Sequence, residues 1–146
     1  MKKLYFLFTL MFAFSIQSQV IITEIADPNN DSQARFIELT NIGDNAFDLT
    51  GYQLVRWTNA NTAYTTSSAV DLSEFGSLQS KGILTLANNT NFETVYGVAP
   101  TKVIGSTGPA DSNGDDNIAI LDPNGSIYDV YGVPGTDGTG QPHEFE

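Results

Sequence analysis

Residues Val20–Trp57 read VIITEIADPNNDSQARFIELTNIGDNAFDLTGYQLVRW, and this stretch sets the fold class. Two apolar runs, Val20–Ile25 and Phe36–Leu39, have the composition of strands. Between them, Asp27–Ser32 is a cluster of turn formers that cannot continue a strand. Tyr52–Trp57 is a third strand-like run. Three such segments so close together indicate an all-β protein.

Further strand signals and one helix signal follow. Thr90 and Glu93 fit a capping box, and Gly97 stands where a helix C-cap is expected, so the sequence predicts one short helix. With the strands below, the chain is expected to form a β-sandwich of about seven to nine strands. The additional predicted strands are part of Val70–Leu78, then Ile83–Ala87, Lys102–Ile104, Asn117–Asp122 and Ser126–Tyr131.

Turn chemistry supports this strand order. The dipeptide Asn124-Gly125 lies between two apolar runs and predicts a tight hairpin. Gly51 ends the turn that precedes Tyr52. We therefore expect structural roles for Gly51, Asn124 and Gly125.

The order and spacing of these segments resemble the lamin tail domain, an immunoglobulin-like β-sandwich. The resemblance covers roughly residues 20–132 and implies this fold with one short helix. In the bacterial branch of the family it also implies a secreted accessory module rather than an enzyme, next to extracellular nucleases, other hydrolases or a cell-surface sorting domain. It is carried by Ile22–Ile25, Phe36–Asn41, Leu49–Leu54 and Asp116–Asp129.

The two ends of the chain have the composition of accessory segments. Residues 1–19 combine a two-lysine start, a short apolar run and small polar residues, which predicts a secretory signal peptide and a secreted or cell-surface protein. The run is too short to span a bilayer comfortably, so an uncleaved anchor is the weaker alternative. Residues 133–146 are rich in Gly and Pro and predict a linker. We expect the native chain to continue past Glu146 into a further domain.

Composition excludes several classes of site. The chain has no cysteine, which rules out disulfides, thiolate metal sites and cysteine nucleophiles. It carries 17 acidic and 6 basic residues, and Lys2 and Lys3 belong to the predicted leader. A nucleic-acid surface needs a positive patch, so DNA contact, known for some lamin tail domains, is not expected here.

Two loops carry oxygen ligands at alternate positions. Calcium binds six to eight oxygens, so each loop is a candidate calcium site, although ordinary turns explain the same residues. Neither loop has the glycine that a helix-flanked calcium loop needs at its sixth position. The candidate ligands are Asp27, Asn29 and Asp31 in the first loop, and Asp111, Asn113 and Asp115 in the second.

Two carboxylates lie inside the predicted strands. By strand alternation Glu24 shares a face with Val20 and Ile22, and pairing of the strands brings Glu24 close to Glu38. Paired carboxylates can perform acid–base hydrolysis of glycosides, which is one alternative. We favour structural roles, with hydrogen bonds from the backbone or from Arg35 or Arg56.

Aromatic residues give a third alternative. Exposed rings at Trp57 and Tyr64 would stack on sugars, although rings in strands more often pack in the core. The single histidine, His143, falls in the predicted linker, so nucleophilic catalysis has no fixed base. The sequence therefore predicts no catalytic residue and favours a non-enzymatic module that binds a protein or a cell-surface polymer.

Overall fold

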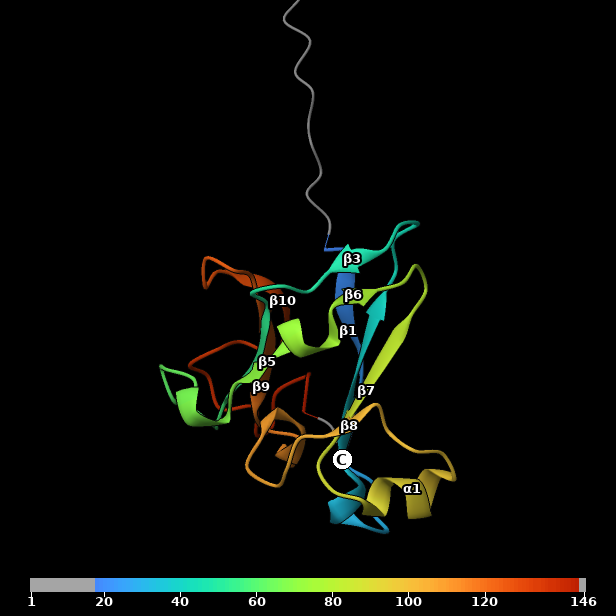
Figure 1. The fold of residues 1–146 in the computed structure, drawn as a ribbon. Coiled ribbons are helices and arrows are strands. Elements are labelled where there is room, and N and C mark those ends of the chain that lie inside the picture. The colour runs from blue at the N-terminus through green and yellow to red at the C-terminus, as the bar shows by residue number, and fades with distance from the viewer. Residues whose placement is uncertain (1–17, 145–146) are drawn as a thin grey trace, which may run out of the picture.

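Two four-stranded sheets face each other in the computed structural model, which describes residues 18–144 (Figure 1). One sheet has the order β1-β2-β7-β8 and the other β10-β9-β4-β5, while β3 and β6 form a short ribbon at one end. The prediction of an all-β protein with one short helix is confirmed. The predicted signal peptide lies outside the described residues, apart from Ser18 and Gln19. No helix within residues 18–144 is both long and apolar enough to cross a membrane.

Ten strands are present in the described residues, against the seven to nine expected. The excess comes from two-residue pairings, such as the ribbon of β3 with β6, within stretches that read as turns. The strands are β1 (Val20–Ala26), β2 (Phe36–Asn41), β3 (Phe47–Asp48), β4 (Gln53–Trp57), β5 (Val70–Asp71), β6 (Ser77–Leu78), β7 (Ile83–Ala87), β8 (Lys102–Val103), β9 (Asn117–Leu121) and β10 (Ile127–Tyr131). The helix is α1 (Asn91–Tyr96), and short 3-10 turns are Ser32–Ala34, Thr66–Ser68, Leu72–Phe75 and Pro109–Asp111.

The main core lies between the two sheets. In β2, Ile37 and Leu39 point inward and are fully buried, whereas Glu38 and Thr40 point outward. This alternation follows from the two-residue period of a strand. Burying apolar side chains provides most of the driving force for folding. The facing residues include Leu54, Leu86, Ile118 and Ile120.

A bulge in β1 changes which residues share a face. The register shifts between Ile22 and Glu24, so that Ile22 pairs with Leu39 and Glu24 pairs with Glu38. The expectation that Glu24 shares a face with Val20 and Ile22 is therefore wrong, because the extra residue of a bulge reverses the alternation beyond it. The expectation that Glu24 and Glu38 lie close together is confirmed.

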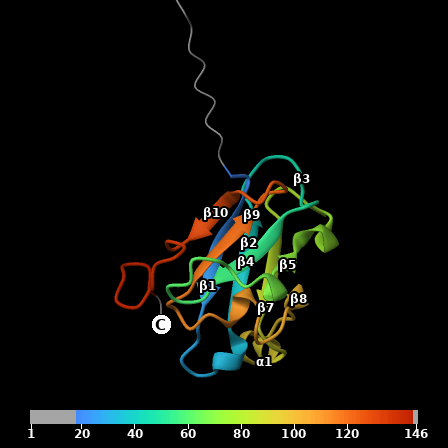
Figure 2. The same cartoon turned by 90° about the vertical axis from the view of Figure 1, so that its left-hand side faces the viewer.

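The two long sides of the sandwich differ. On one side β1 meets β10: the Asp129 carboxylate accepts a hydrogen bond from the Ile22 N–H at 2.7 Å, and the Tyr128 hydroxyl accepts one from the Gln19 N–H at 2.7 Å. On the other side lie the edge strands β5 and β8, across which Glu74 and Lys102 form an exposed ion pair. Figure 2 looks from the side of the β10-β9-β4-β5 sheet.

Helix α1 packs outside the β1-β2-β7-β8 sheet. Its Phe92 is buried against Phe36 and Ala87, which occupy the outer face of that sheet. Gly97 ends the helix in the left-handed conformation (φ 73°), as predicted. The capping-box prediction is wrong: the Thr90 side chain makes no cap bond, and Asn89 instead accepts hydrogen bonds from the Thr90 N–H and hydroxyl.

The predicted hairpin between β9 and β10 is confirmed. Asp122 organises its turn by accepting hydrogen bonds from the N–H groups of Asn124 and Ser126, each at 2.8 Å. Gly125 has φ 79°, a conformation that favours glycine. Gly51 has φ 81°, and a Cβ there would lie 3.0 Å from a side-chain atom of Pro123, so this turn also requires glycine.

Residues 133–144 contact the sandwich. Asn117, which is fully buried, accepts a hydrogen bond from the Val133 N–H at 2.7 Å and donates one to the Thr136 carbonyl at 2.8 Å. The Gly138 N–H donates to the Asp115 carbonyl at 2.9 Å. The start of the Gly/Pro-rich segment is thus tied to the loop that leads into β9.

Candidate interaction surface

At one end of the sandwich, Arg35 joins the two loops that carry the candidate calcium ligands. Its guanidinium donates to both Asp27 oxygens, at 2.7 and 3.0 Å, and to Asp111 at 3.4 Å. Arg35 and Asp27 are each only 17% exposed. The hydrogen bond and charge of Asp27 raise the pKa of Arg35 above its ordinary value, so the cation is strongly held. The ion pairs therefore connect the β1–β2 loop to the loop before β9.

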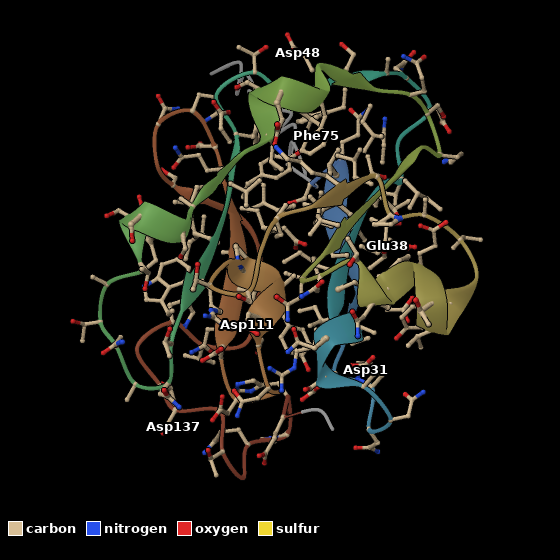
Figure 3. The ribbon with its side chains drawn as sticks, turned by 60° about the horizontal axis from the view of Figure 1, so that its bottom comes forward. Asp31, Glu38, Asp48, Phe75, Asp111 and Asp137 are labelled. Carbon is tan, nitrogen blue, oxygen red and sulfur yellow. The ribbon has the colours of Figure 1, made fainter. Side chains whose placement is uncertain are left out.

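The six candidate calcium ligands have separate surroundings. Asp31 accepts hydrogen bonds from the Gln33 N–H and from the Asn91 side chain, and Asp115 accepts one from Asn59. Asp27 and Asp111 are bound to Arg35, while Asn29 and Asn113 are exposed. Figure 3 shows Asp31 and Asp111 at the same end of the molecule. In residues 18–144, no group of three or more His, Cys, Asp or Glu side chains is arranged to hold a metal ion.

A second ion pair lies beside this end. Arg56 donates to Asp116 at 3.0 Å, and Asp116 also accepts a hydrogen bond from the Asn59 N–H at 3.0 Å. Asp116 is almost fully buried, and the loss of hydration raises its pKa despite the opposing effects of Asn59 and Arg56. Arg35 and Arg56 thus bind aspartates, and the alternative in which they donate hydrogen bonds to Glu24 or Glu38 is wrong.

At acidic pH the Asp116→Asn variant is expected to be less stable than the wild type by about 1–2 kcal/mol. The two oxygens of Asp116 accept hydrogen bonds from two donors, Arg56 and the Asn59 N–H, whereas the side-chain amide has only one acceptor oxygen and leaves one donor unpaired. A raised pKa means that folded Asp116 binds its proton more tightly than unfolded Asp116. Its contribution to stability therefore falls as pH rises from about 3.8 through the folded value. The deficit of the variant should be largest near pH 4 and shrink toward neutral pH. Urea unfolding of both proteins across this range tests the prediction, and a deficit that grows with pH would contradict it.

The outer face of the β1-β2-β7-β8 sheet is built in three rows across the strands. Helix α1 covers the first row, which contains Phe36. The second row pairs Glu24 with Glu38, and the third pairs Thr40 with Ile21 and with Ile83. Figure 3 shows Glu38 beside the α1 ribbon. We call the part beyond the helix the outer patch, which comprises Ile21, Thr23, Glu24, Glu38, Thr40 and Ile83.

Threonine hydroxyls hold one of the two carboxylates in place. The Thr23 hydroxyl donates to Glu38 Oε1 at 2.7 Å and lies 2.8 Å from the Thr40 hydroxyl. Thr40 also approaches Glu38 Oε1, at 3.4 Å. The bulge makes this possible because it places Thr23 within reach of β2. Glu38 is therefore fixed, whereas Glu24 is exposed.

Apolar surface borders these carboxylates. Ile83 is 53% exposed, and Tyr96, at the end of α1, is 39% exposed. Burial raises the pKa of Tyr96, and the negative charge of the nearby Glu24 contributes to the rise. The outer patch thus combines two carboxylates and two hydroxyls with exposed Ile83 and half-buried Ile21 on a sheet surface that includes the β1 bulge. This composition fits contact with a macromolecule, because protein interfaces combine apolar area with polar groups.

The candidate stacking residues lie elsewhere: Trp57 is buried and Tyr64 is half-buried. Trp57 is only 7% exposed and packs edge-on against Tyr64, with 5.4 Å between ring centroids. The alternative in which Trp57 presents an exposed ring for sugar stacking is therefore wrong, and the packing expected more often of rings in strands is confirmed for Trp57. The outer face of β4 and β9 is apolar, and residues of the following segment, Tyr64 and Ala69, pack over it.

Two buried asparagines, Asn41 and Asn117, hold loop segments in place, and sequence reasoning did not identify either of them. Asn41, fully buried, donates to the carbonyls of Asn45 and Leu78 and accepts from the Gly43 N–H. Asn117 has a similar role at the opposite end of the core. The available signal was the position of each asparagine inside or at the end of an apolar run, where a buried amide needs several partners.

A model of the family described as Lamin Tail Domain matches residues 15–135, most of the chain. The matched range begins before β1 and ends after β10, so it includes every strand of both sheets. Among curated proteins, no match to this chain is found.

Proposed function

This chain belongs to the lamin tail domain family of non-catalytic, immunoglobulin-like domains, and on that basis we propose that it is a secreted, non-enzymatic interaction module. The leader-like composition of residues 1–19 supports secretion to the culture fluid or the cell surface. The chain is strongly acidic, with 17 acidic and 6 basic residues, which favours a partner other than nucleic acid.

The observation that carries the proposal is the outer patch. It is a sheet surface with two hydrogen-bonded hydroxyls, two carboxylates and the exposed Ile83. A glycoside hydrolase instead places its two carboxyl groups on opposite sides of a sugar bond, with the sugar between them. Glu24 and Glu38 stand side by side on neighbouring strands and Glu38 is bound by Thr23. This arrangement favours binding over hydrolysis.

The proposal is tested by expressing the full chain with its own leader in the producing cells. We expect the protein in the culture fluid or on the cell surface, with a mass that lacks residues near 1–19. The purified secreted protein, labelled with a fluorophore, should bind the cell surface saturably and should not hydrolyse glycans or nucleic acids. Retention inside the cells, or hydrolysis that is lost in the Glu24→Gln/Glu38→Gln variant, would overturn the proposal.

A further inference from the structure

We propose that the outer patch binds an extended segment of a partner protein that presents arginine side chains. This inference rests on the proposed function and names the chemistry of the partner. It starts from the sheet register, in which Glu24 on β1 lies directly opposite Glu38 on β2. Like charges in opposite positions of neighbouring strands repel each other, so a cation at this place would relieve the repulsion.

Within residues 18–144, the basic side chains form their ion pairs away from the outer patch. Apart from the two lysines of the leader, the basic residues of the chain are all bound elsewhere in the described structure. Arg35 and Arg56 bind buried or half-buried aspartates, and Lys81 and Lys102 pair with Asp44 and Glu74. A second copy of the chain has the same basic residues in the same pairs. None of the described basic residues therefore supplies a positive charge at the outer patch, and we place that charge on a partner protein.

The surroundings of the two carboxylates favour a long cationic side chain over a bare ion. Arginine has an apolar stem and a planar head whose donors match carboxylate geometry. Exposed Ile83 offers apolar surface for the stem, and the partly exposed Tyr96, which packs against Phe92 and Phe36, borders the carboxylates on the side of α1. Glu38 is already oriented by Thr23 and Thr40, so little of its freedom is lost on binding.

The spacing of the rows fits an extended partner. Residues two positions apart on a strand are separated by about 6.8 Å, and this is also the spacing between alternate side chains of an extended peptide. The row of Glu24 and Glu38 and the row of Thr40 and Ile83 are two positions apart on β2. Alternate side chains of an extended segment can therefore reach both rows, with an arginine over the carboxylates and an aliphatic stem or residue over Ile83.

The experiment titrates the full chain with a synthetic ten-residue peptide of alternating arginine and threonine. Binding is measured by calorimetry and by chemical shifts of backbone amides. We expect the shifted amides to cluster in β1, β2 and β7. A peptide in which citrulline, the neutral analogue, replaces arginine should bind at least tenfold more weakly.

Two double variants separate the outer patch from the overall negative charge. Glu24→Gln/Glu38→Gln should weaken binding at least tenfold. Asp44→Asn/Glu74→Gln, which removes two exposed carboxylates elsewhere, should change it less than twofold. All four sites are on the surface, so both variants should keep the melting temperature within a few degrees, and thermal unfolding checks this.

Several results would overturn the inference. Equal weakening in the two double variants would mean attraction by net charge only. Shifts of the same amides by calcium alone, with no effect of the arginine peptide, would assign the outer patch to a divalent cation. Dimerisation that Glu24→Gln/Glu38→Gln abolishes would assign it to a second copy. If this variant binds the producing cells as well as the wild type, the arginine inference fails while the proposed function stands.

Discussion

The Arg35→Met variant is expected to lose about 3 kcal/mol of unfolding free energy. The substitution removes the partner of Asp27 and Asp111 and leaves two carboxylates from opposing loops close together without a cation. Breaking a buried ion pair by removing one partner typically costs about 3–5 kcal/mol. We take the lower end because Arg35 and Asp27 keep some exposure to solvent, which screens the interaction. Urea denaturation followed by fluorescence of Trp57 measures the loss.

Two further variants show whether charge is the cause. Lys81→Met removes one positive charge from an exposed pair with Asp44 and should cost less than about 0.5 kcal/mol. Adding Asp27→Asn and Asp111→Asn to Arg35→Met removes the unpaired carboxylates and should restore more than half of the lost stability. A cost for Arg35→Met no larger than that of Lys81→Met would show that the two loops are held together by other contacts.

The Asn117→Ala variant is expected to lose about 2–4 kcal/mol and to release residues 133–144. The substitution removes the hydrogen bonds to the Val133 N–H and the Thr136 carbonyl, each worth about 0.5–1.5 kcal/mol, and leaves a cavity at a fully buried position. Gly132 fits closely at the same place: a Cβ there would lie 2.2 Å from Asn117 Oδ1. Limited proteolysis with mass spectrometry should find early cleavage after residue 132.

Asn113→Ala is the matched control, since Asn113 is exposed in the loop just before the same strand. It should change stability by less than about 0.5 kcal/mol and leave the cleavage pattern unchanged. If residues 133–144 stay protected in Asn117→Ala, then other contacts, such as that of the Gly138 N–H with the Asp115 carbonyl, hold the segment.

The position of most strands could be predicted from the sequence, because the pattern of apolar and polar side chains that forms a strand is local. The alternation of Phe36–Asn41 and the apolar run Ile83–Ala87 appear as β2 and β7 with nearly the predicted bounds. The hairpin at Asn124-Gly125 and the helix end at Gly97 were equally predictable. At these glycines the required backbone conformation restricts the residue type, so the residue reveals the conformation.

The candidate site was only partly predictable. The proximity of Glu24 and Glu38 followed from pairing two adjacent strands. The face of the sheet on which Glu24 lies did not, because a one-residue bulge leaves no signal in the apolar pattern. Packing of Trp57 was favoured from the sequence, but the segment that covers it was not predicted. That segment reads as a polar loop, although its Tyr64 and Ala69 pack against the cluster that contains Trp57.

By itself, the sequence determined the all-β class, the order of the strands, the turns and the strong negative charge. Each of these depends on side-chain types and on neighbours a few residues apart. Only the tertiary structure decided that Arg35 binds Asp111, which is 76 residues away, and that Arg56 binds Asp116, which is 60 residues away. Arg35 meets Asp111 because the two sheets pack face to face, and Arg56 meets Asp116 because β4 pairs with β9 within one sheet. Both contacts hold an arginine away from the outer face of the β1-β2-β7-β8 sheet, where Glu24 and Glu38 have no cation from residues 18–144 beside them.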